Sequence, residues 1–209
     1  FDDGTKSDWS DFTFVDGFGL PSEENGRFVF NLPGAGQDIF TASQKVSREI
    51  TLVEGQTVEL KVDVVETSGE DAFAVLAFIP NTDGNSPGTL AGYGLAKDPT
   101  DVLITKGILK YFIADDGEGA NIQNENITLS LELSVIDGNV HITGTIIDKA
   151  SGDILWQETV IDTPAADVMT DGSDEPAAPF ITSGYFTLYG YQQFNGTDEY
   201  RVVYDNAIL

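Results

Sequence analysis

Tyrosines at alternating positions near the end of the chain have the residue type and spacing best suited to binding chemistry. Tyr185, Tyr189 and Tyr191 share one face of a predicted strand, with Thr187 between them. Aromatic rings on a sheet can stack on the apolar faces of sugars while the hydroxyl stays free for hydrogen bonds. The pattern predicts a carbohydrate-binding surface, although the same stripe can also be the core and rim of a β-sandwich. Further aromatic candidates for this surface are Trp156, Tyr93 and Tyr111.

Two residue types that support much of enzyme chemistry are rare in this sequence. There is no cysteine, which excludes disulfides, thiolate zinc sites, iron–sulfur clusters and cysteine nucleophiles. His141 is the single histidine, so a multi-histidine metal site is excluded and a Ser-His-Asp triad would depend on this residue. His141 alternates with Val140 and Ile142, which places it on the polar face of a strand. We therefore assign no catalytic residue.

The charge balance narrows the classes of partner. The 209 residues include 10 Lys and Arg against 35 Asp and Glu, a net charge of −25. Such a surface repels phosphate backbones and anionic lipid, so we expect neither nucleic acid nor a membrane surface as partner. No apolar run approaches the roughly 18 residues of a membrane span. The chain begins with Phe1 rather than Met, so we expect a processed or trimmed chain, and the acidity fits an exported protein, a saline habitat or cation binding.

Alternation of apolar and polar residues predicts strands along nearly the whole chain. Residues 127–135 alternate strictly and are followed by the turn Asp137-Gly138-Asn139 and by return strands over 140–147 and 154–160, a three-stranded meander. Residues 72–79 are apolar on both faces, as expected for a central strand. Stretches 81–99, 115–124 and 163–179 are predicted to be irregular. Further strands are predicted at 28–32, 58–64, 185–191 and 201–209, and the whole predicts one all-β domain over 1–209, a two-sheet antiparallel sandwich with a barrel as the alternative.

Both ends of the chain carry a pattern found in a known fold family. The N-terminal region has Phe1-Asp2-Asp3-Gly4 and Glu24-Asn25-Gly26-Arg27-Phe28, and the chain ends in Tyr204-Asp205-Asn206-Ala207-Ile208-Leu209. These segments resemble the concanavalin A-like lectin/glucanase (LamG-like) jelly rolls of bacterial secreted and cell-surface proteins. The resemblance implies that an N-terminal strand pairs with the terminal strand.

The same resemblance implies a structural calcium ion where the first and last strands meet. It places Asp205 as a carboxylate ligand, Gly26 as a backbone carbonyl ligand and Asp3, or Asp2, as an additional charge. Calcium accepts six to eight oxygens of mixed kinds, so this chemistry is sound. The alternative is that Asp205 and Asn206 only cap the end of a strand.

Catalytic patterns of related jelly rolls are broken in this chain. Family-16 glycosidases carry Glu-x-Asp-x-(x)-Glu on one strand, but the corresponding stretch here begins with Lys61, which cannot replace the nucleophile, and continues to Asp63 and Glu66. The stretch 185–193 is faintly similar to an alginate-lyase signature, with Thr187 in place of its Lys. The charged residues of 61–66 are therefore interpreted as the exposed face of a strand.

Two functions of different classes follow. The first is an exported, noncatalytic, lectin-like carbohydrate-binding sandwich that is stabilised by calcium. The second is a structural or adhesive extracellular or cell-surface protein that self-associates without a small ligand. A polysaccharide hydrolase or lyase is a weaker third hypothesis.

Overall fold

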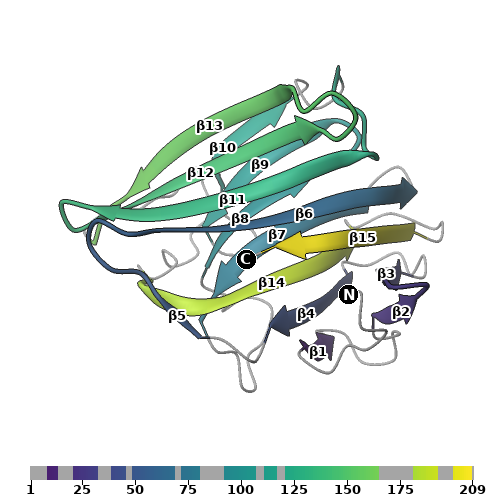
Figure 1. Ribbon diagram of the computed structural model, residues 1–209, viewed down its shortest axis with the longest axis horizontal. Helices are drawn as coiled ribbons and strands as arrows, with labels where there is room; N and C mark the ends of the chain where they lie inside the picture. Colours follow the sequence, from purple (N-terminus) through teal and green to yellow (C-terminus); the bar gives the residue numbers. More distant parts are fainter. Residues whose placement is uncertain are drawn as a thin grey trace.

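The structure is a computed structural model, and it describes residues 9–13, 21–32, 39–45, 49–68, 72–80, 92–106, 111–116, 121–164, 181–192 and 200–208. These residues form two layers of antiparallel strands (Figure 1). Among them, no helix has the length and apolar character needed to cross a membrane.

The first layer, here called sheet A, has the strand order β1-β4-β14-β7-β8-β9-β10, and β5 pairs with β14. Its strands are β1 (Trp9–Thr13), β4 (Ile39–Lys45), β5 (Ile50–Thr51), β7 (Ala72–Ile79), β8 (Tyr93–Lys97), β9 (Asp101–Lys106), β10 (Tyr111–Asp116) and β14 (Ser183–Gln192). Strand β7 lies between β14 and β8 and is apolar on both faces, so the predicted central strand is confirmed. Strand β8 falls inside the stretch 81–99 that was predicted to be irregular, and that prediction is wrong for these five residues.

The second layer, sheet B, has the order β13-β12-β11-β6-β15-β3-β2. Its strands are β2 (Ser22–Glu24), β3 (Arg27–Leu32), β6 (Thr57–Ser68), β11 (Ile127–Ile136), β12 (Asn139–Asp148), β13 (Ile154–Asp162) and β15 (Tyr200–Ile208). The predicted meander is confirmed as β11, β12 and β13, which lie side by side in Figure 1. The predicted pairing of an N-terminal strand with the terminal strand is also confirmed, because Val203 of β15 is the partner of Val29 in β3.

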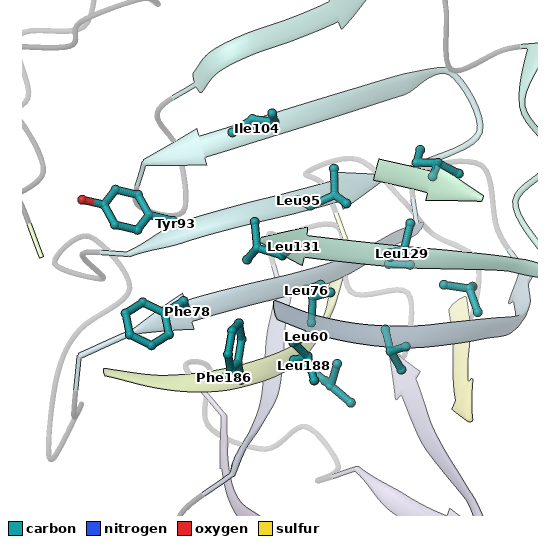
Figure 2. Close-up of a cluster of buried hydrophobic side chains, with 14 of the residues drawn as sticks. Leu60, Leu76, Phe78, Tyr93, Leu95, Ile104, Leu129, Leu131, Phe186 and Leu188 are labelled. Atoms are coloured by element: carbon teal, nitrogen blue, oxygen red, sulfur yellow. The ribbon is translucent and has the colours of Figure 1, made fainter. Parts of the chain in front are cut away.

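The core fills the space between the sheets, because alternate residues of each strand point inward. Figure 2 shows this cluster, in which Leu129 and Leu131 of β11 meet Leu76 and Leu95 of sheet A. Phe78 and Phe186 make an edge-to-face contact with ring centroids 5.3 Å apart. Burial of large apolar side chains of this kind contributes roughly 1.5–3 kcal/mol each. The inward residues of one strand therefore fix which residues face outward.

Candidate functional site

Strand β14 presents its tyrosines on the outer face of sheet A. Phe186 and Leu188 are buried in the core, at 1% and 0% exposure. Because neighbouring side chains of a strand point to opposite faces, Tyr185 and Thr187 lie on the outer face. Tyr185 is half-buried, and its carbonyl oxygen accepts a hydrogen bond from the Thr187 hydroxyl at 3.4 Å. The predicted surface for stacking is thus on the side of sheet A that faces away from sheet B.

The structure describes the backbone of the other two tyrosines of this strand, whereas their side chains lie outside the described residues. Tyr189 is in register with Ala42 and Val75, and Tyr191 with Phe40 and Phe73. Their positions therefore continue the alternation that begins at Tyr185. The side chain of Tyr111 also lies outside the described residues, so its predicted role stays a prediction.

Small residues form the middle of the same outer face. Gly94 shows this arrangement directly: a Cβ added there would lie 2.6 Å from the Thr105 hydroxyl oxygen and 3.9 Å from the Cβ of Ala77. The small residues in the middle of this face are thus covered by other atoms, whereas Tyr185 keeps part of its surface exposed. Its small members, all less than one-tenth exposed, are Ala77, Gly94, Ala96, Thr105 and Thr187.

Two of the additional aromatic candidates lie in the interior rather than on this face. Trp156 belongs to β13 of sheet B, is 6% exposed and points into the core, where its ring lies 3.1 Å from a Cβ placed on Gly144. Tyr93 is 1% exposed and also belongs to the core. Both residues are therefore separated from the outer face of Tyr185 by the packing of the sandwich.

A buried ionic group joins the two sheets at Tyr93 and was not foreseen from the sequence. The Lys106 ammonium of β9 lies 2.7 Å from one oxygen of Asp162 in β13, and the Tyr93 hydroxyl donates to the other oxygen at 2.8 Å. Lys106 and Asp162 are 2% and 0% exposed. Burial, followed by the adjacent Asp162 carboxylate, raises the pKa of the Tyr93 hydroxyl, so this hydroxyl remains a donor.

A second buried lysine, Lys97, donates its hydrogen bonds to a carbonyl and an amide oxygen. The Lys97 ammonium donates to the Asn124 side-chain oxygen at 2.6 Å and to the Asp98 carbonyl oxygen. Burial lowers the pKa of Lys97 to about 8. Lysine is rarely buried in proteins, so two buried ammonium groups, at Lys97 and Lys106, are unusual for a domain of this size. The two buried ammonium groups act within the interior and are not part of the outer face of sheet A.

The residues predicted to bind calcium lie where β3 meets β15. Asn25 and Gly26 have φ values of 55° and 76° and form the two-residue turn between β2 and β3. One oxygen of Asp205 lies 3.5 Å from Nε of Arg27, and the other accepts the backbone N–H of Asn206 at 2.9 Å. Asp3 lies outside the described residues.

Asp63 of β6 is the cross-strand partner of Asp205 and has its own set of donors. It accepts hydrogen bonds from the Thr128 hydroxyl at 2.6 Å and from the Asn206 amide at 2.8 Å, and the Lys149 ammonium lies 2.7 Å away. Burial raises the pKa of Asp63, but these hydrogen bonds and the Lys149 charge outweigh it and lower the pKa below its usual value.

This donor set does not fit a calcium ion. Calcium takes six to eight oxygen ligands, whereas the carboxylates here contact a guanidinium and an ammonium group. In the described part of the chain, no three acidic or histidine side chains gather as metal ligands would. The calcium prediction at Asp205 therefore disagrees with the chemistry of the residues that surround it.

The stretch compared with a glycosidase motif lies on β6 with its charges directed away from the core. Lys61 pairs with Glu59 at 2.9 Å, and Glu66 lies 3.4 Å from Arg201. Val62 and Val64, on either side of Asp63, are fully buried, and a register shift between Val64 and Glu66 precedes the Glu66 contact. The charged positions of 61–66 therefore belong to the outer face of sheet B, where Lys61 pairs within β6 and Glu66 pairs with Arg201 of β15.

Comparison with known proteins gives a clear answer for the fold. No family model matches the sequence, and no curated protein matches it. Solved structures do match over nearly the whole chain. The carbohydrate recognition domain of Emp46p, in a potassium-bound form, has a TM-score of 0.52 at 13% identity, with 97% of this chain and 90% of that chain covered.

Two further structures extend the comparison to other activities. Arcelin-5, a lectin-like defense protein from Phaseolus vulgaris, has a TM-score of 0.56 at 8% identity, covering 94% of this chain and 95% of its own. A laminarinase from Flavobacterium sp. UMI-01 has a TM-score of 0.54 at 9% identity, covering 96% and 92%. The concanavalin A-like jelly roll expected from the chain ends is therefore confirmed, and at these identities the similarity concerns the fold.

Proposed function

We propose that this concanavalin A-like sandwich is a noncatalytic, lectin-like domain that binds neutral polysaccharide on the outer face of sheet A. The observation that carries the proposal is the alternation on β14, where buried Phe186 and Leu188 fix Tyr185 on the outer face. Tyr189 and Tyr191 occupy alternate positions of the same strand. The net charge of −25 favours neutral over acidic glycans, because acidic glycans would be repelled.

The experiment is affinity electrophoresis in native gels that contain a neutral β-glucan or mannan. We expect the wild type to be retarded and Tyr185→Ala, Tyr189→Ala and Tyr191→Ala each to reduce the retardation. Loss of one aromatic contact of about 1–1.5 kcal/mol corresponds to roughly 5–10-fold weaker binding. Tyr185→Phe, which keeps the ring, should retain most of the affinity.

Thermal unfolding of each variant controls for damage to the fold, since Tyr185 is half-buried. If the alanine variants unfold like the wild type and still migrate with full retardation, the tyrosine face is not the binding site. If the wild type is not retarded by any neutral polysaccharide, the carbohydrate-binding proposal itself fails.

The location and the metal requirement belong to the same proposal. We place the domain outside the cell or at the cell surface, in keeping with its acidity and with the resemblance of its ends to exported jelly rolls. Calcium bound at Asp205 is not required by the proposed stacking contacts, which use β14 alone. Retardation measured with calcium and with a chelator tests whether any ion contributes to binding.

A structural, self-associating protein is the second candidate, and the edge of sheet B supports it. Strand β13 ends the sheet, and its exposed apolar residues include Ile154 at 60% and Ile161 at 52%. Unpaired edges with apolar residues are templates for pairing with another chain. Sedimentation over a range of concentrations separates the two candidates, because assembly without glycan retardation favours the structural protein.

Hydrolysis remains a weaker candidate, since a laminarinase shares the fold. Incubation with the same polysaccharides, followed by measurement of new reducing ends, tests it. New reducing ends would replace the noncatalytic proposal by an enzymatic one.

A further inference from the structure

We propose that Arg27 and Lys149 are built-in cations that neutralise an aspartate pair, Asp205 and Asp63, so that the junction of β3, β6 and the terminal strand β15 holds without a divalent ion. The inference is independent of the proposed carbohydrate binding. It concerns how β3, β6 and β15 are held together on the outer face of sheet B.

The two aspartates need positive charge because of their register. Asp205 of β15 and Asp63 of β6 are direct cross-strand partners. Side chains at such positions lie on the same face with Cβ atoms about 4.5–5.5 Å apart, and like charges there are destabilising. The ladder is irregular immediately after Asp205, where Asn206 has a φ of 50° and donates its side-chain amide to Asp63. The amide bridges the strands but adds no charge.

Each aspartate has its own cation, and the two cations come from different parts of the chain. Arg27 follows the turn at Gly26, and its Nε lies 3.5 Å from Asp205. Lys149 lies in the turn between β12 and β13, with its Nζ 2.7 Å from Asp63. The turn is held in place because the Lys149 N–H donates to the Asn126 carbonyl oxygen at 3.1 Å. Two negative and two positive charges therefore cancel at the junction.

These contacts occupy the carboxylate oxygens that a divalent ion would use. Arg27 contacts Oδ2 of Asp205, and Lys149 contacts Oδ2 of Asp63. A calcium ion placed between the carboxylates would be repelled by both cations, and among the described residues no third acidic or histidine side chain joins the pair to complete the six to eight ligands it takes. The guanidinium and ammonium groups supply the same sign of charge through the polypeptide itself.

Thermal unfolding in millimolar calcium and in excess chelator is the first test. We expect the wild-type midpoint to differ by less than about 1 °C between the two, whereas occupancy at a hundredfold excess over Kd would shift it by roughly 5–10 °C. A decrease on chelation that Asp205→Asn abolishes would show that a divalent ion occupies the junction, and it would overturn the proposal.

Double-mutant cycles are the second test, with Arg27→Gln against Asp205→Asn and Lys149→Gln against Asp63→Asn. We expect Arg27→Gln to lower the midpoint by roughly 1–3 °C when Asp205 is present and to have almost no effect when Asn occupies position 205. Lys61→Gln is the matched control, because Lys61 pairs with Glu59 on the same sheet and should not couple to Asp205. Additive effects in both cycles would show that the cations act through other contacts, which contradicts the proposal.

Discussion

The outer faces of the two sheets are built from different kinds of residue. On sheet B, polar side chains of neighbouring strands bond to one another: Thr128 donates to Asp63 at 2.6 Å, and Ser130 donates to Glu59 at 2.7 Å. On sheet A, half-buried Tyr185 is the cross-strand partner of Ile79, and the small residues in the middle of the face are buried. One face therefore satisfies its polar groups by cross-strand hydrogen bonds and ion pairs, whereas the other has a partly exposed aromatic ring and small, buried side chains.

The difference is our reason for placing the proposed ligand on sheet A rather than on sheet B. A sheet face whose carboxylates are matched by hydroxyls and cations gains cross-strand contacts of about 0.2–1 kcal/mol each. Such groups are costly to redirect toward a sugar, because each would lose an existing partner. Aromatic rings lose no such partner when a sugar stacks on them. Sheet B is thus the structural face, and sheet A is the face on which we place carbohydrate binding.

Both outer faces depend on the interior that lies between the sheets. The largest expected loss of folding stability therefore comes from removing the buried Lys106–Asp162 ion pair. Asp162→Asn leaves the Lys106 ammonium buried without its counter-charge, at 3% side-chain exposure. Removing one partner of a buried ion pair costs about 3–5 kcal/mol, a decrease of roughly 6–20 °C in midpoint for a domain of this size. Thermal and urea unfolding measure the loss.

Two variants sharpen this test. Glu158→Gln changes an exposed acid on the same strand and should stay within about 0.5 kcal/mol of the wild type. Adding Lys106→Met to Asp162→Asn should recover part of the loss, because no unpaired charge then remains buried. A wild-type midpoint for Asp162→Asn would show that this ion pair does not join the sheets.

The strands could be predicted wherever alternation ran for long enough. Residues 127–135 and 72–79 gave β11 and β7 because periodicity and apolar content are properties of the segment itself. Strand β8 was missed because its five residues, Tyr93–Lys97, are few and lie in a Gly- and Pro-containing stretch. The inward position of Trp156 was also missed. The register between β12 and β13 shifts next to Trp156, between Ile146 and Ile147, so its face does not follow from alternation along the strand alone.

Contacts between site residues that lie far apart in the chain could not be predicted from the sequence. Tyr185 was placed on a face by its alternation with Phe186, which is local information. The contacts of Arg27 with Asp205 and of Lys106 with Asp162 depend on which strands lie side by side and in what register. Neither charge nor spacing along the chain specifies that register, so these pairs followed only from the structure.

The structural role of sheet B predicts a moderate dependence of stability on pH through Asp63. Its pKa is lowered in the folded state, so its contribution is present above the unfolded pKa of about 3.9 and is lost as pH falls through the folded value. We expect the wild type to lose more stability than Asp63→Asn between neutral pH and about pH 3. Urea unfolding at both pH values measures the difference, and Glu158→Gln should follow the wild-type profile. Equal losses for the wild type and Asp63→Asn would contradict a stabilising role for this carboxylate.

The smallest expected effect is on sheet B, where Thr143 and Thr159 share an exposed hydrogen bond of 2.8 Å. Thr143→Ala removes it and should cost at most about 0.5–1 kcal/mol, because an exposed bond is exchanged for one to water. Thr143→Ala also serves as a control in the binding assay, because the substitution leaves the outer face of sheet A unchanged. Retardation in the polysaccharide gel should therefore equal that of the wild type while Tyr185→Ala migrates faster through the same gel. If Thr143→Ala instead lost retardation and Tyr185→Ala kept it, the glycan would contact sheet B, and the assignment of the two faces would have to be reversed.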